Sequence, residues 1–209
     1  MIAASVVLNL YQMKPITKKV VLITILALPL LLVFADEYPA LRFRGDGRFS
    51  GGPVFGYWIR LKAIPFGQAG EYSFHFRGMP NEEMSLQLYA EGKTHDNRSE
   101  LTNLSTQLEA LLVDQSGRVV CHGAGVVPKE GGPCQDCKVW TDEEIAARRQ
   151  KEWVLMSGPD DAYYHVNCLN MKLKPSESYT LTLRIGAVDP NTPRINLIPT
   201  LEGGQLDLP

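Results

Sequence analysis

The chain has 209 residues, of which 44% are hydrophobic and 21% are charged, and these proportions are ordinary for a globular protein. The formal net charge is −2, and it becomes −5 when Lys14, Lys18 and Lys19 are removed with an N-terminal leader. A mildly acidic domain lacks the positive surface that nucleic-acid binding needs, so we expect no nucleic-acid partner.

The N-terminal segment has the pattern of a secretory leader. Val20 to Ala35 form an uncharged apolar run directly after Lys18 and Lys19. This run is short for a membrane span and ordinary for the apolar part of a signal peptide. Val33-Phe34-Ala35 offers a small-x-small cleavage site. We therefore predict a leader over residues 1–35.

The rest of the chain is then a single exported domain. Met13 is the expected true start, because MKPITKK is a conventional positively charged beginning of a leader. Residues 36–209 form an extracytoplasmic domain, periplasmic or secreted. The alternative is an uncleaved membrane anchor over residues 20–35 with the domain outside, and this anchor is the only membrane contact that we expect.

Beyond the leader, short segments alternate between apolar and polar side chains, which is the pattern of strands with one buried face. In the first half of the chain the alternation predicts strands over residues 41–44, 57–63, 71–77 and 84–90. The glycine-rich segment from Gly45 to Pro53 predicts a loop. Four short strands joined by glycine- and proline-rich turns are therefore expected here.

The middle of the chain predicts a hairpin, a long loop and a helix. Residues 107–113 and 118–121 form two strands around a turn at 114–117. Residues 122–138 are rich in Gly, Pro and Cys, which favours an irregular loop. Thr141 and Glu144 form a capping box, so we expect one short inserted helix over 141–151.

The last third contains the clearest strand of the chain. Residues 153–156 and 163–168 have strand character, and a final strand follows over 195–201. Between them, the segment 178–185 alternates strictly, which predicts a core strand. Its inward set is Tyr179, Leu181, Leu183 and Ile185, and we expect these to face Tyr72, Phe74, Phe76, Leu86 and Leu88 across a sandwich.

Eight or nine short strands with one helix indicate an all-β sandwich. A jelly-roll-like arrangement is the first choice, because the first and last strands are short, apolar on one face and free to pair. An immunoglobulin-like sandwich is the alternative, although the Cys-Trp-Cys spacing of that fold is not evident.

The four cysteines all lie in the exported part, which favours disulfides in an oxidising compartment. Three pairings are possible, and we prefer Cys121 with Cys168 across strands and Cys134 with Cys137 locally. The alternative is a metal-binding or redox-active exported protein. Its ligands would come from the set Cys121, His122, Cys134, Cys137, His165 and Cys168.

No cofactor is expected from the remaining motifs. Zinc at the Cys/His set and calcium at Asp160 and Asp161 are the alternatives, but a calcium site needs further oxygen ligands that the sequence does not assign. The motifs of serine hydrolases, zinc peptidases and nucleotide-binding enzymes are absent from the sequence, so no residue receives a catalytic role.

Outward aromatic side chains are the remaining signal for function. Trp58, Tyr89 and Tyr163 each fall on the polar side of a predicted strand. Exposed rings can stack on a sugar or pack against a protein partner. The alternative is that the predicted helix or the cysteine-rich loop covers them. The expected function is therefore non-catalytic binding of a glycan or an envelope protein.

Overall fold

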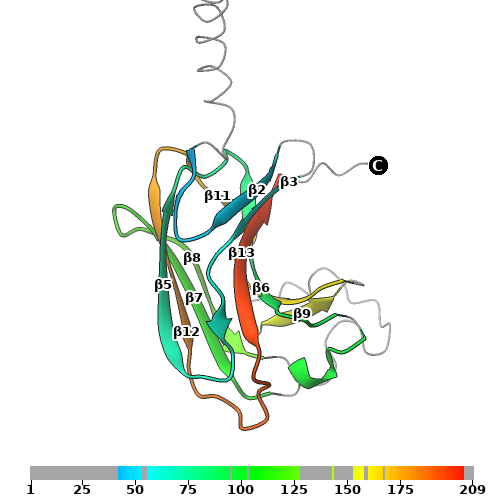
Figure 1. The fold of residues 1–209 in the computed structure, drawn as a ribbon. Helices are drawn as coiled ribbons and strands as arrows, with labels where there is room; N and C mark the ends of the chain where they lie inside the picture. The colour runs from blue at the N-terminus through cyan, green and yellow to red at the C-terminus, as the bar shows by residue number, and fades with distance from the viewer. Residues whose placement is uncertain are drawn as a thin grey trace, which may run out of the picture.

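The chain folds almost entirely into strands. The computed structural model describes residues 42–52, 56–94, 96–102, 104–127, 143, 153–157, 160–166 and 168–204. In this part of the chain two antiparallel sheets pack face to face, and one 3-10 turn, η1 (Ser99–Leu101), lies between strands (Figure 1). The predicted all-β sandwich is confirmed.

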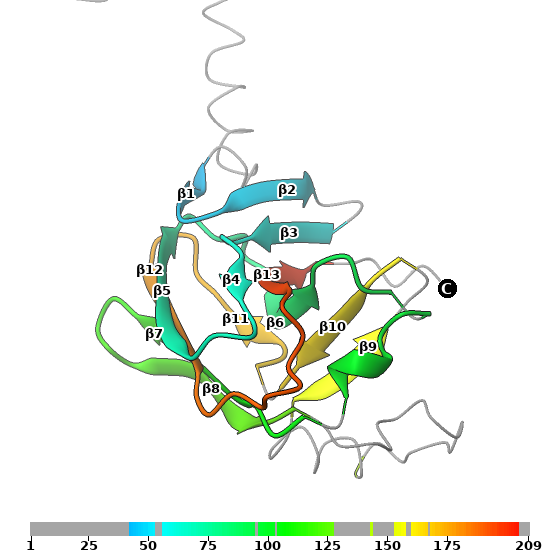
Figure 2. The same ribbon diagram turned by 60° about the horizontal axis from the view of Figure 1, so that its bottom comes forward.

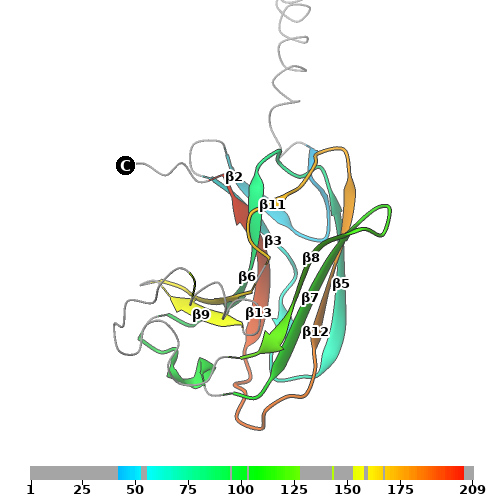
Figure 3. The same ribbon diagram turned by 180° about the vertical axis from the view of Figure 1, so that it is seen from behind.

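The first layer is a five-stranded sheet. It can be followed in Figure 3, where the whole molecule is seen from behind. Its strands lie in the order β1–β5–β12–β7–β8. Their bounds are β1 (Arg44–Gly45), β5 (Gly70–Arg77), β12 (Ser178–Ile185), β7 (Gln107–Asp114) and β8 (Val119–Val126).

The second layer is an eight-stranded sheet with the path β2–β3–β13–β6–β10–β9. Two further short strands extend it, because β4 pairs with β13 and β11 pairs with β6. The bounds are β2 (Arg48–Gly52), β3 (Gly56–Arg60), β4 (Ile64–Pro65), β6 (Glu83–Ala90), β9 (Val154–Ser157), β10 (Ala162–His165), β11 (Met171–Lys172) and β13 (Asn196–Gly203).

The strand order is that of a jelly roll. Its eight main strands form the rows β3–β13–β6–β10 and β5–β12–β7–β8, and Figure 2 shows these rows as two layers. Successive main strands alternate between the layers except at the β7–β8 hairpin. The first and last of them, β3 and β13, pair from Arg60 opposite Thr200 to Tyr57 opposite Gly203. The first predicted strand, over residues 41–44, overlaps β1, which pairs with β5 and not with the last strand. The strand beside β13 is therefore the second predicted one, over residues 57–63.

The core lies between the sheets and follows the predicted alternation. Tyr179, Leu181, Leu183 and Ile185 of β12 are all buried. One part of the expectation is wrong, because Tyr72, Phe74 and Phe76 belong to β5, which pairs with β12 in the same sheet. Leu86 and Leu88 of β6 do lie in the opposite sheet. The sequence identifies the buried face of a strand but not its neighbours.

The glycine-rich segment predicted as a loop forms β1 and β2 instead. Phe49 of β2 lies 5.8 Å from Tyr57 and 6.1 Å from Phe43, measured between ring centroids, so its ring joins the core. Gly51 has φ +91°, and a Cβ there would lie 2.1 Å from the Gly56 carbonyl oxygen. The glycines therefore permit close strand pairing here, and the tertiary contacts override their low strand propensity.

The second correction concerns β8, which runs to Val126, whereas the sequence predicted a loop from residue 122. The alternation is hidden because Gly123 occupies an inward position. A Cβ at Gly123 would lie 2.4 Å from a methyl group of Val166, so a side chain there has no room. Strand character therefore continues through a glycine that the approach of the opposite sheet requires.

Several predicted features fall outside the described residues. These are the leader over 1–35, Cys134, Cys137 and the helix over 141–151, of which only Glu143 is described, as helical and exposed. Within the described ranges, no helix has the length and apolar character needed to cross a bilayer.

The turn of the β7–β8 hairpin provides a pH-dependent prediction. The Asp114 carboxylate accepts hydrogen bonds from the Ser116 hydroxyl at 2.6 Å, from the Ser116 and Arg118 backbone N–H groups, and from Arg118 Nε. These bonds, that of the Ser116 hydroxyl first, lower the pKa of Asp114 to about 2. The folded state therefore favours the ionised carboxylate.

We expect wild type to be more stable than Asp114→Asn, because the amide cannot replace the charge and loses one acceptor oxygen. Because the pKa of Asp114 is lower in the folded state, the ionised carboxylate stabilises the fold at pH values above the ordinary pKa of 3.8. This stability is lost as the pH falls through about 2. Urea unfolding of both proteins between pH 6 and pH 2.5 measures the difference. A difference that stays constant over this range would contradict the assignment.

Candidate functional site

Three aromatic side chains lie on the outer face of the eight-stranded sheet, the face that points away from the five-stranded sheet. Trp58 belongs to β3, Tyr89 to β6 and Tyr163 to β10. Each alternates with buried core residues and is itself half-buried. The sequence predicted the outward direction of all three, and the strand order now places them on one surface. We call this set the aromatic face.

Glu202 lies at the centre of the aromatic face. On β13 it is opposite Trp58 of β3 on one side and opposite Ser85 of β6 on the other. The Tyr89 hydroxyl donates a hydrogen bond of 2.8 Å to Glu202 Oε2, and Gln87 Nε2 donates one to Oε1. A polar interaction with the side chain of Trp58 acts to lower the pKa of this carboxyl. Glu202 therefore lies between aromatic residues of two strands.

The environment of Glu202 is unusual for a carboxylate. Burial raises the pKa of the Glu202 carboxyl above its ordinary value, although the hydrogen bond from Tyr89 opposes the rise and the charge of Asp161 adds to it. Burial, followed by the charge of Glu202, raises the pKa of Tyr89 well above that of a free phenol. Tyr89 therefore remains a hydroxyl donor at any ordinary pH.

Tyr89 and Tyr163 form a continuous aromatic platform. They are directly opposite in the pairing of β6 with β10, and their ring centroids are 5.0 Å apart with planes inclined by 36°. His165 meets the edge of Tyr163 at 6.1 Å and is buried. Such tilted pairs hold each other in place. The platform is therefore pre-arranged before any ligand arrives.

A polar atom beneath the platform has unused hydrogen-bonding capacity. Gln87 is only 8% exposed, and its Oε1 has no hydrogen-bond partner among the described residues. A buried acceptor without a donor costs free energy, which a water or ligand hydroxyl at this position would recover. The aromatic face thus combines apolar rings with hydrogen-bonding groups.

Sequence reasoning missed Glu202 and Gln87. Both occupy the outward positions of strands whose apolar residues were recognised, at β13 and β6. A polar residue on the outer face of a strand is the ordinary case, so it carries no signal on its own. Only the pairing of β13 between β3 and β6 shows that these two side chains meet the aromatic residues.

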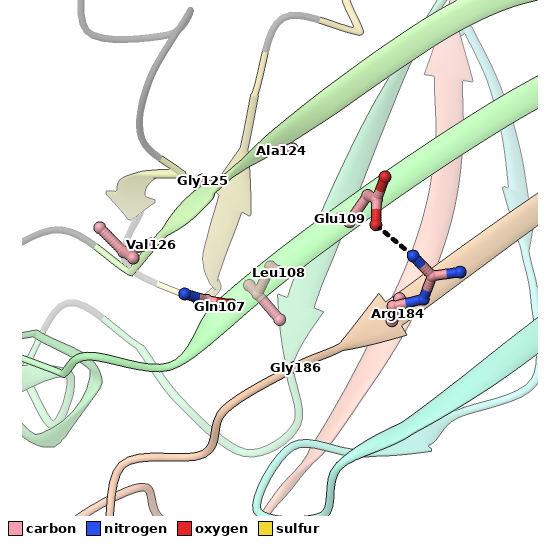
Figure 4. Close-up of a pocket in the computed structure, with 8 residues that line it drawn as sticks. All are labelled: Gln107, Leu108, Glu109, Ala124, Gly125, Val126, Arg184 and Gly186. Carbon is pink, nitrogen blue, oxygen red and sulfur yellow. Dashed lines mark hydrogen bonds and ion pairs between the residues drawn. The ribbon is translucent and has the colours of Figure 1, made fainter.

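A pocket away from the aromatic face lies on the outer face of the five-stranded sheet (Figure 4). It has a volume of about 350 Å³ and is lined by β7, β8 and the end of β12. Arg184 at its edge bridges Glu71 at 2.7 Å and Glu109 at 2.9 Å, and Glu109 also contacts His122 at 3.0 Å. Because these charges form a cross-strand ladder, they are already engaged with each other.

The predicted disulfide between Cys121 and Cys168 is present, with a Cα–Cα distance of 5.4 Å. It joins β8 of the five-stranded sheet to the segment between β10 and β11 of the eight-stranded sheet. The bond removes two thiolates from the proposed metal set. The two histidines of that set point outward from different sheets, His122 from β8 and His165 from β10.

In the described part of the chain, no three His, Cys, Asp or Glu residues lie close enough together to hold a metal ion. Asp160 and Asp161, the residues named in the calcium alternative, are both exposed. Among known proteins, no family model matches this chain, and no curated protein matches its sequence. The functional argument therefore depends on the aromatic face itself.

Proposed function

We propose that this protein is a non-catalytic binding protein that holds a glycan on its aromatic face. The observation that carries this proposal is the convergence of Trp58, Tyr89 and Tyr163 around Glu202. Aromatic rings stack on the apolar faces of sugars. Carboxylate and amide groups beside the rings can bind sugar hydroxyls and so orient the ligand.

The charges on the aromatic face favour a neutral glycan. Glu202 and Asp161 are close enough that the charge of Asp161 raises the pKa of Glu202. A carboxylate or sulfate on the ligand would add a third negative charge at this position. Arg60 offsets part of this charge, since it lowers the pKa of Glu202. We therefore expect uncharged sugars to bind better than acidic ones.

The proposed location is outside the cytoplasm. The Cys121–Cys168 bond supports this, because structural disulfides persist in oxidising compartments. The leader pattern over residues 1–35 supports it independently. A periplasmic or secreted protein with an aromatic face would meet cell-wall or environmental glycans.

A glycan array followed by calorimetric titration tests the proposal. We expect Trp58→Ala and Tyr163→Ala to weaken binding of the best neutral glycan by about tenfold each, which is about 1.4 kcal/mol of lost stacking. Tyr89→Phe removes the hydroxyl that donates to Glu202 and should weaken binding by about fivefold.

Tyr72→Phe is the matched control, because it also removes a hydroxyl from a half-buried tyrosine but lies on β5 of the other sheet. It should leave the affinity unchanged. Two results would overturn the proposal: no neutral glycan binds wild type, or folded Trp58→Ala binds as tightly as wild type. Circular dichroism and the unfolding midpoint show that each variant is folded.

A further inference from the structure

Two hydrogen-bond acceptors with unused capacity lie next to each other on the aromatic face. An ionised carboxylate accepts about four hydrogen bonds, and the Glu202 carboxylate receives one from the Tyr89 hydroxyl and one from Gln87 Nε2. Because the amide nitrogen of Gln87 faces this carboxylate, its Oε1 points away from the negative charge. Oε1 has no hydrogen-bond partner among the described residues, although Gln87 is only 8% exposed. A ligand that brings hydrogen-bond donors therefore fits this position better than one that brings acceptors.

Two negative charges flank the platform of Tyr89 and Tyr163. Glu202 reaches Tyr89 from β13, through the hydrogen bond of 2.8 Å. Asp161 directly precedes β10 and, by strand alternation, is on the same face as Tyr163. Burial is the first cause of the raised pKa of the Tyr89 hydroxyl, and the charges of Glu202 and Asp161 raise it further. Both charges therefore act at the rings.

Two arginines on the same sheet lie further from the platform. Arg60 of β3 is directly opposite Thr200 of β13, and Arg48 of β2 is opposite Arg60. Strand β13 therefore separates both arginines from the platform on β6 and β10. Burial is the main cause of the raised pKa of Glu202, and among the charges Asp161 raises this pKa by more than Arg60 lowers it. The field at the platform is thus negative.

We propose that the glycan bound by the aromatic face is basic, a chain of amino sugars that carry free ammonium groups. This inference rests on the proposed function and names the class of sugar. An ammonium group brings three N–H donors and a positive charge. Its donors match the unused acceptor positions of Glu202 and Gln87, and its charge complements the two carboxylates.

The rings add to this preference. A cation within about 6 Å of the centroid of an aromatic ring is attracted to the face of that ring. The centroids of Tyr89 and Tyr163 are 5.0 Å apart, so a sugar that stacks on one ring can place its ammonium beside the other or beside Glu202. Neutral and N-acetylated sugars also stack but bring no charge. The charges that disfavour an acidic glycan therefore favour a basic one over a neutral one.

The test uses the full chain, expressed in an exporting host, and β-linked tetramers of glucose, N-acetylglucosamine and glucosamine. These probes share one backbone and differ only in the substituent at carbon 2 of each ring. Calorimetric titration at a mildly acidic pH, where the amines are protonated, measures the affinity for each probe. We expect the glucosamine tetramer to bind wild type about tenfold more tightly than the glucose tetramer. Added salt should reduce this advantage, because it screens the charges.

Glu202→Gln tests the source of the preference, because it removes the charge and keeps the size of the side chain. It should reduce the advantage of the glucosamine tetramer about fivefold. Asp161→Asn should reduce it about twofold, since the charge of an exposed residue is screened. Glu71→Gln is the matched control, the same change at an exposed residue of β5 in the other sheet. It should leave the ratio of the two affinities unchanged.

A preference for the glucosamine tetramer that falls in Glu202→Gln and not in Glu71→Gln supports the inference. It is overturned if the glucose or N-acetylglucosamine tetramer binds as tightly as the glucosamine tetramer, if folded Glu202→Gln keeps the full preference, or if none of the tetramers binds. When a neutral glycan of the array still binds wild type in any of these cases, the proposed function stands and only the amino-sugar class is wrong. When no glycan binds at all, both are wrong.

Discussion

Replacing Cys121 and Cys168 together by serine is expected to lower the free energy of unfolding by about 4 kcal/mol. The two cysteines are 47 residues apart in the sequence, and their bond closes a loop that the unfolded chain cannot open. In the chain-entropy account, a loop of this length restricts the unfolded state by that amount. Both cysteines are buried, so a single serine would also leave an unpaired thiol in the core.

Urea unfolding without reductant measures the effect, with Cys134→Ser/Cys137→Ser as the matched control. A bond between Cys134 and Cys137 would close only a short loop, so its loss should cost much less than the loss of the long-range bond. Equal unfolding midpoints for wild type and Cys121→Ser/Cys168→Ser would show that the long-range bond does not stabilise the fold.

Trp153→Ala is expected to lower the free energy of unfolding by about 4 kcal/mol, which is within the usual range for removing a large buried ring. Trp153 immediately precedes β9 and has no exposed surface. Its indole Nε1–H donates a hydrogen bond of 2.9 Å to the Leu108 carbonyl oxygen of β7. Alanine leaves a cavity between the sheets and an acceptor without its donor.

Two matched variants separate these contributions. Trp153→Phe keeps most of the ring and loses the hydrogen bond, so we expect it to lower the free energy of unfolding by about 2 kcal/mol. Val119→Ala truncates a side chain that is 55% exposed and should change stability by less than about 0.5 kcal/mol. The packing role of Trp153 would be refuted if Trp153→Ala lost no more stability than Val119→Ala.

The jelly-roll order connects this scaffold to the proposed function. Tyr89 and Glu202 are 113 residues apart in the sequence and meet because β13 returns to lie between β3 and β6. The same return places Trp58 beside Glu202. The aromatic face therefore forms only when the last strand has paired. Destabilising the late strands should remove binding together with the fold.

Much of the fold is readable from the sequence, because a strand with one buried face must alternate. The segments 70–77, 83–90 and 178–185 alternate clearly, and the structure has β5, β6 and β12 at these places. The prediction fails at β2 and at the end of β8. There, glycines occupy strand positions where a neighbouring strand or side chain comes too close for a Cβ.

The candidate site is readable only in part. Trp58, Tyr89 and Tyr163 stand out as large rings at positions that alternate with the apolar residues of their strands, and the sequence correctly predicts their outward direction. Their common surface cannot be inferred, since three strands could be arranged in many orders. Glu202 and Gln87 show no signal because polar residues are expected at outward positions.

By itself, the sequence determined the all-β class and the buried face of most strands, because these depend on local alternation. It left three cysteine pairings open, and the structure shows Cys121 paired with Cys168. Only the tertiary structure decided which strands are neighbours. Neighbours follow from the packing of whole sheets and from backbone approaches at glycines such as Gly51 and Gly123. The aromatic face is a product of that second level.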